Sequence, residues 1–131
     1  VVLAFAGERI FRSSDQGMSW DSCNNPGLVQ VWMTGEGVLY GAQDNQVLVR
    51  SDDEGSFWIP AGLEGAAVYC VCEDMDGRLF AGLYHAGVAR RNAEAPEWEL
   101  ANSGMVASTL FRIAMDSGGA FFGLMEPDLL V

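Results

Sequence analysis

Two eight-residue stretches decide the fold: Ser13–Trp20 reads SSDQGMSW, and Ser51–Trp58 reads SDDEGSFW. Both follow the pattern Ser-x-Asp-x-Gly-x-x-Trp, they begin 38 residues apart, and each follows a short apolar run that ends in Arg. A Ser hydroxyl and an Asp carboxylate accept backbone N–H groups in a tight turn, Gly adopts a positive φ, and Trp supplies a large apolar ring. The pattern therefore predicts a hairpin turn that is covered by a tryptophan.

The segments around these turns repeat as well. Gly37–Gly41, Gly77–Ala81 and Gly119–Gly123 align with one another, as do the apolar runs that precede them. The spacing is about forty residues, which is typical of repeat architectures. A third turn of the same type is expected at Arg91–Trp98, where only Trp98 keeps the pattern.

Each unit contains four short apolar or aromatic runs separated by Gly, Asp, Asn and Pro, which is the pattern of strands and turns. The complete middle unit reads LVQVWMT, VLYGAQ, QVLVRS and SFWIPA. Several runs are apolar at successive positions, which predicts sheets that are covered on both faces. Four-stranded units of this length are typical of β-propeller blades, with a single long sandwich as the alternative.

The sequence therefore predicts an all-β chain made of antiparallel blades: a partial blade at 1–25, full blades at 26–64 and 65–104, and a partial blade at 105–131. Such a set cannot close a ring, because propellers have about four to eight blades. Val131 aligns with Val49, in the middle of a unit. We expect the partial propeller to be completed by a homo-oligomer, with a dimer favoured, or by the remainder of a longer propeller.

The two turns resemble the Asp box of the sialidase-like, or BNR-repeat, β-propellers. The segments Pro26–Leu28 and Ala61–Leu63 are similar to sortilin-like, oligoxyloglucan-hydrolase-like and photosystem-assembly-factor-like repeats. The resemblance implies that the boxes lie on the outer rim, away from the central ligand face, and that their residues are structural. These residues are Ser13, Asp15, Gly17 and Trp20 in the first box, Ser51, Asp53, Gly55 and Trp58 in the second, and Trp98 in the third unit. Members of these families do different things, so the resemblance constrains fold more than activity.

The composition argues against several partners. Seven Arg and no Lys stand against 18 acidic residues, a net charge of −11, which disfavours nucleic acid and anionic membrane surfaces. Cys23, Cys70 and Cys72 are expected to be free, packed thiols. The single histidine, His85, is expected in an exposed turn, and neither a metal site nor a cofactor motif is predicted. The compartment is left open, with a lean toward an extracytoplasmic or secreted protein.

Four charged residues near the ends of the innermost strands are candidates for lining a central channel: Arg112, Glu73, Asp74 and Asp116. A sialidase-like enzyme would need three clustered arginines, a Tyr–Glu pair and an acid, whereas Arg12, Arg50 and Arg90 recur at one position of the repeat. The sequence therefore favours a non-catalytic scaffold that binds a protein or a glycan. The alternative is part of a sialidase-like or related glycoside hydrolase.

Overall fold

The computed structural model describes residues 1–6, 8–44, 47–92, 95, 97–105, 109–116 and 118–126. Within these residues the chain forms thirteen β-strands and no helix, which confirms the predicted all-β class. Because the described residues form no helix, they contain no helical segment that could span a membrane. Apolar residues fill most positions of the strands that are six or seven residues long, and Gly, Asp, Asn and Ser are frequent in the turns.

The strands form four antiparallel sheets, each built from consecutive strands of the chain. The first sheet contains β1 (Val2–Ala6), β2 (Arg9–Ser13) and β3 (Asp21–Cys23). The second contains β4 (Leu28–Met33), β5 (Leu39–Gln43), β6 (Leu48–Ser51) and β7 (Ile59–Pro60). The third contains β8 (Val68–Glu73), β9 (Leu79–Leu83), β10 (Gly87–Arg91) and β11 (Glu99–Leu100), and the fourth contains β12 (Thr109–Met115) and β13 (Phe121–Glu126).

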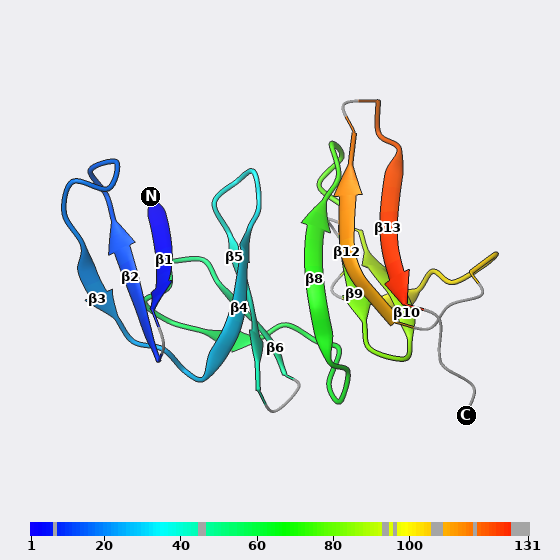
Figure 1. Cartoon of the computed structure of the whole chain (residues 1–131), viewed down its shortest axis with the longest axis horizontal. Helices are drawn as coiled ribbons and strands as arrows, with labels where there is room; N and C mark the ends of the chain where they lie inside the picture. Colours follow the sequence, from blue (N-terminus) through cyan, green and yellow to red (C-terminus); the bar gives the residue numbers. More distant parts are fainter. Residues whose placement is uncertain are drawn as a thin grey trace.

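The sheets follow one another through the molecule. Figure 1 shows the first, second and third sheets in succession along the longest axis, with β12 and β13 lying against the third. One sheet falls in each of the ranges 1–25, 26–64, 65–104 and 105–131. The strand expected at Asp128–Val131 lies outside the described residues, as do Glu94 and Pro96 of the expected third box.

The first strands of the last three sheets lie next to one another, because β8 contacts both β4 and β12. Each of these strands carries a β-bulge against the second strand of its sheet. The residue left out of the register is Val29 in β4, Tyr69 in β8 and Phe111 in β12. A bulge bends its strand and changes the direction of a side chain. Each of these three sheets therefore has one side chain outside the regular pleat, near the start of its first strand.

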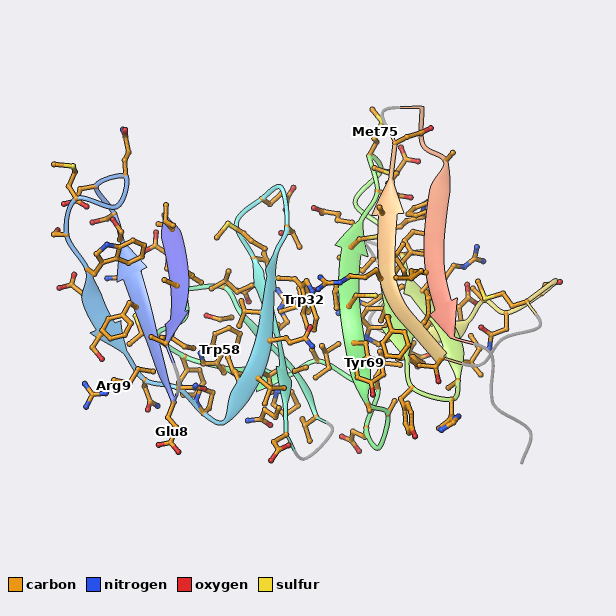
Figure 2. The ribbon with its side chains drawn as sticks, viewed as in Figure 1. Glu8, Arg9, Trp32, Trp58, Tyr69 and Met75 are labelled. Carbon is orange, nitrogen blue, oxygen red and sulfur yellow. The ribbon has the colours of Figure 1, made fainter. Side chains whose placement is uncertain are left out.

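Both faces of the second sheet are covered by neighbouring sheets. Val49 packs toward the first sheet with Ile10 and Leu28, and the adjacent Leu48 packs toward the third. Consecutive residues of a strand point to opposite faces, so β6 supplies both interfaces. Figure 2 shows Trp58 between the first and second sheets and Trp32 between the second and third.

The third and fourth sheets approach closely at Gly82 in β9. A Cβ atom at this position would lie 2.5 Å from Cys70 Sγ and 2.6 Å from the backbone oxygen of Leu110. The backbone oxygen cannot move aside without displacing β12. The absence of a side chain at Gly82 therefore permits the two sheets to pack at this distance.

We predict that Gly82→Ala lowers the free energy of unfolding by about 1–3 kcal/mol, because the added methyl group overpacks the interface. Gly35→Ala is the matched control, since its Cβ would lie 3.5 Å from Glu73 Oε2, an ordinary contact distance. Urea denaturation of both variants measures the difference. Equal stability of the two variants would contradict the sheet packing described here.

Candidate functional site

The first box is a hydrogen-bonded turn centred on the hydroxyl of Ser13, which is 1% exposed. The Ser13 hydroxyl donates to Asp15 Oδ1 at 2.8 Å and accepts the N–H of Gly17 at 2.7 Å. The Asp15 carboxylate accepts the N–H and the hydroxyl of Ser19 at 2.9 and 2.5 Å. Gln16 and Gly17 both have positive φ, 61° and 89°. The side chains of Ser13 and Asp15 are therefore engaged within the turn.

The second box repeats this geometry. The Ser51 hydroxyl, also 1% exposed, donates to Asp53 at 2.7 Å and accepts the N–H of Gly55 at 2.9 Å. Asp53 accepts the N–H of Phe57 at 2.8 Å. The indole N–H of Trp58 donates to the carbonyl of Gly55 at 3.0 Å, which orients the ring against the first sheet.

Hydrogen bonds to the box carboxylates lower their pKa values. The hydroxyl and N–H of Ser19, followed by the hydroxyl of Ser13, lower the pKa of Asp15 from 3.8 to about 2. The hydroxyl of Ser51 and the N–H of Phe57 lower the pKa of Asp53. Both residues are thus held as hydrogen-bonded anions in the turns at neutral pH.

The third unit keeps the tryptophan without the box. Trp98 donates its indole N–H to the carbonyl of Ala61 at 2.8 Å and packs on the core between the second and third sheets. Trp58 packs against the first sheet, and Trp98 against the second. Each of these tryptophans therefore covers the face of the preceding sheet. Trp20, in the first sheet, is 42% exposed.

A second family of turns joins the first and second strands of the last three sheets. Asp74 Oδ1 accepts the N–H groups of Asp76 and Arg78 at 2.9 and 2.8 Å. Asp116 Oδ1 accepts the N–H groups of Gly118 and Ala120 at 2.9 and 2.8 Å. Thr34 takes the equivalent place in the second sheet, where its hydroxyl accepts the N–H of Val38. Two of the expected channel residues, Asp74 and Asp116, thus use their carboxylates to close hairpins.

Burial acts to raise the pKa of Asp74, but hydrogen bonds from the N–H and the guanidinium of Arg78 outweigh it, and the pKa is lowered. The Arg78 Nε atom lies 2.5 Å from Asp74 Oδ2. Asp74 is therefore charged and paired at neutral pH, unlike a general acid, whose pKa would need to be raised.

A cleft of 560 Å³ lies between the second and third sheets at the end where these hairpins turn. Glu73 and Asp74 line it, whereas Arg112 and Asp116 do not. Glu73 Oε2 accepts the N–H of Gly35 at 2.6 Å and so links the two sheets. Arg50 also lines the cleft, and its Nε atom is buried with no hydrogen-bond partner among the described residues.

Five arginines each have partners of their own, and two of them, Arg50 and Arg91, line the same cleft. Arg12 bonds Glu54, Arg50 bonds Asp52, Arg78 bonds Asp74 and Asp76, Arg90 bonds Glu99, and Arg91 bonds the carbonyl of Ala95. The Arg12–Glu54 pair, at 3.0 Å, joins the first sheet to the second box. Arg112 is exposed on β12.

An aromatic cluster occupies the opposite end of the third sheet from the cleft. It consists of Tyr69, Tyr84, His85 and Phe111. The ring of Tyr69 lies 5.8 Å from that of Tyr84 and 5.1 Å from that of Phe111, and the rings of Tyr84 and His85 are 3.8 Å apart. Figure 2 shows Tyr69 and Met75, which belongs to the β8–β9 turn, toward opposite ends of this sheet.

Two structural features create the aromatic cluster. Tyr69 and Phe111 are the bulge residues of β8 and β12, which the register leaves outside the pleat. Tyr84 and His85 form the β9–β10 turn, where the N–H of His85 donates to the hydroxyl of Thr109 at 3.1 Å and joins the third and fourth sheets. Tyr84 is 47% exposed and His85 is also exposed, whereas Tyr69 and Phe111 are half-buried.

The cysteines are free thiols, as predicted. Burial raises the pKa of Cys70 and raises that of Cys72 to about 11, so both remain protonated at neutral pH. Thiols in this state are poor nucleophiles and poor metal ligands. Among the residues that the structure describes, no group of three or more His, Cys, Asp or Glu side chains could hold a metal ion.

We predict that Ser51→Ala lowers the free energy of unfolding by about 1–3 kcal/mol, because it leaves the N–H of Gly55 without its buried partner. Ser56→Ala, an exposed change in the same turn, is the control and should stay within about 0.5 kcal/mol of the parent. Thermal and urea unfolding measure both values. If Ser51→Ala and Ser56→Ala lowered the free energy of unfolding by the same small amount, the box would not be needed for stability.

The lowered pKa of Asp15 predicts a pH-dependent contribution to stability. A carboxyl group whose pKa falls on folding stabilises the protein above its unfolded pKa, and this contribution is lost as the pH drops through the folded value. The difference in melting temperature between the parent and Asp15→Asn should therefore be full above pH 4 and disappear toward pH 2. Glu64→Gln, outside the boxes, is the control. A difference that stays constant from pH 7 to pH 2 would contradict this role of the charge.

No protein-family model matches the chain, and no curated protein matches it either.

Proposed function

We propose that the chain is a segment of an Asp-box β-propeller, in which the four sheets are two full and two partial blades. Three observations support this architecture. The sheets are consecutive antiparallel meanders, the first strands of the last three lie together, and both Ser-x-Asp-x-Gly-x-x-Trp segments form the same turn. Further blades would come from a second copy, with a dimer favoured, or from the remainder of a longer propeller.

On this architecture we propose that the segment is a non-catalytic scaffold that binds a glycan or a protein through the aromatic cluster. The observation that carries the proposal is the β-bulge recurring on the first strands, which turns Tyr69 and Phe111 out of the pleat beside Tyr84 and His85. Bulges are enriched next to functional sites because they re-aim side chains. Aromatic side chains with a polar tip are likewise enriched at recognition surfaces.

Of the two ligand classes, a neutral glycan fits the cluster better. A sugar ring combines a face of C–H bonds with a rim of hydroxyl groups, and a phenol ring offers an apolar face with a hydroxyl at its edge. The net charge of −11 would repel an acidic glycan as it approaches the protein. The cluster is also composed of side chains that lose little conformational freedom when a ligand binds.

The pairing of the charged residues favours this function over the glycoside hydrolase alternative. Asp74 and Asp116 close hairpin turns, and Asp15 and Asp53 close the boxes. Five arginines are engaged by separate partners. A hydrolase would need a carboxylic acid and a second carboxylate facing each other across the scissile bond.

We predict that the chain binds a neutral xyloglucan oligosaccharide and that Tyr84→Ala weakens this binding about tenfold, equivalent to roughly 1.4 kcal/mol. Phe57→Ala is the control, because Phe57 is 69% exposed but belongs to the second box. Isothermal titration calorimetry measures both affinities, and a fluorogenic sialoside tests turnover in parallel. If both variants lowered the affinity for the oligosaccharide equally, the aromatic cluster would not be the binding site. Turnover of the sialoside would favour the hydrolase.

A further inference from the structure

An apolar pocket of 220 Å³ lies between the third and fourth sheets. Phe80 and Val88 line it from the third sheet, and Leu110, Ile113, Phe121 and Gly123 line it from the fourth. The rings of Phe80 and Phe121 are 4.4 Å apart across the interface. An apolar cavity of about 150 Å³ is enough to hold benzene, so a space of this size can accept an indole ring.

The repeat shows what fills the equivalent space elsewhere in the molecule. Leu28, Val31 and Gly41 stand 82 residues before Leu110, Ile113 and Gly123, and Ile10 and Cys23 stand 78 residues before Val88 and Ala101. Ala101 also lines the pocket. Four of the first five, Leu28, Val31, Ile10 and Cys23, belong to the same hydrophobic cluster as Trp58, and Gly41 lies against the Trp58 ring, at the interface of the first and second sheets. The pocket thus has the lining of a tryptophan site.

The local geometry of the two places agrees as well. A Cβ at Gly41 would lie 2.7 Å from Leu28 Cδ2 and 3.2 Å from Trp58 Cζ3. A Cβ at Gly123 would lie 2.8 Å from Leu110 Cδ1. The glycine and the leucine are therefore arranged alike, and the space that the ring takes in the first interface corresponds to the pocket in the last.

We propose that this pocket is a docking site for the tryptophan of an additional box hairpin, a polypeptide segment of the Ser-x-Asp-x-Gly-x-x-Trp type. Its strand would add to the edge of β13 that no described strand pairs with, just as β6 pairs with β5, and its tryptophan would enter the pocket. Among the described residues the fourth sheet has two strands where the second has four, so the added hairpin would take the places of the third and fourth strands. The proposal does not depend on ligand binding by the aromatic cluster.

The test uses the chain's own box as the probe. A synthetic peptide with the sequence of residues 47–63 is added to the intact chain, and a peptide carrying Trp58→Ala is the matched control. Met105 lines the pocket, so its methyl signal in a ¹H–¹³C NMR spectrum reports occupancy without altering the pocket. We expect the parent peptide and free indole to shift this signal, and the Trp58→Ala peptide to bind at least about tenfold more weakly.

A second pair of variants checks the location. Ala101→Leu places a larger side chain in the pocket and should abolish the shift, whereas Ala120→Leu, an exposed change in the β12–β13 turn, should leave it intact. Absence of a shift with both indole and peptide, or equal affinity of the two peptides, would overturn the proposal. Self-association of the chain that Trp20→Ala abolishes would identify the Ser13–Trp20 box of a second copy as the source of the tryptophan and would support the proposal.

Discussion

The structure depends on one constraint: each sheet is a single layer that cannot bury its own two faces. The second sheet satisfies the constraint because it has a neighbour on each side, with Val49 packing toward one and Leu48 toward the other. Large aromatic rings fill the space between layers, since Trp58 and Trp98 each pack back on the preceding sheet. The unit of stability is therefore a pair of adjacent sheets and the tryptophan between them, as expected for architectures that stack repeats.

The boxes hold these tryptophans at the required place. A serine that is 1% exposed, an aspartate and a glycine at positive φ fix the chain three residues before the ring. Carboxylates also close the first hairpins of the third and fourth sheets, where Asp74 and Asp116 accept backbone N–H groups. Much of the acidic surface that a sequence search would nominate for catalysis is thus used to shape turns. This use of the carboxylates supports the proposal of a binding scaffold, which needs only an exposed contact surface, over the proposal of a hydrolase.

Much of this could be read from the sequence. The forty-residue spacing and the two boxes predicted the all-β class and antiparallel sheets, because turn residues and apolar runs recur together. The bulges could not be predicted, since Val29, Tyr69 and Phe111 read as ordinary members of continuous apolar runs. The role of Asp74 and Asp116 had a usable signal in the glycine three residues later, at Gly77 and Gly119, which marks the hairpin turn. Asp74 directly follows β8, the first strand of its sheet, but its pairing with Arg78 could not be predicted from the sequence.

The repeat separates positions that must stay alike from positions that are free to differ. Leu28 and Gly41 recur as Leu110 and Gly123 because both pairs shape the space for a ring between layers. The bulge position carries Val29, Tyr69 and Phe111 on the same backbone irregularity, and none of the three belongs to the buried core clusters between the sheets. A surface built on the bulges can therefore change its chemistry from one sheet to the next while the interfaces remain fixed. The aromatic cluster forms where two aromatic residues occupy adjacent bulges and the β9–β10 turn adds Tyr84 and His85 beside them.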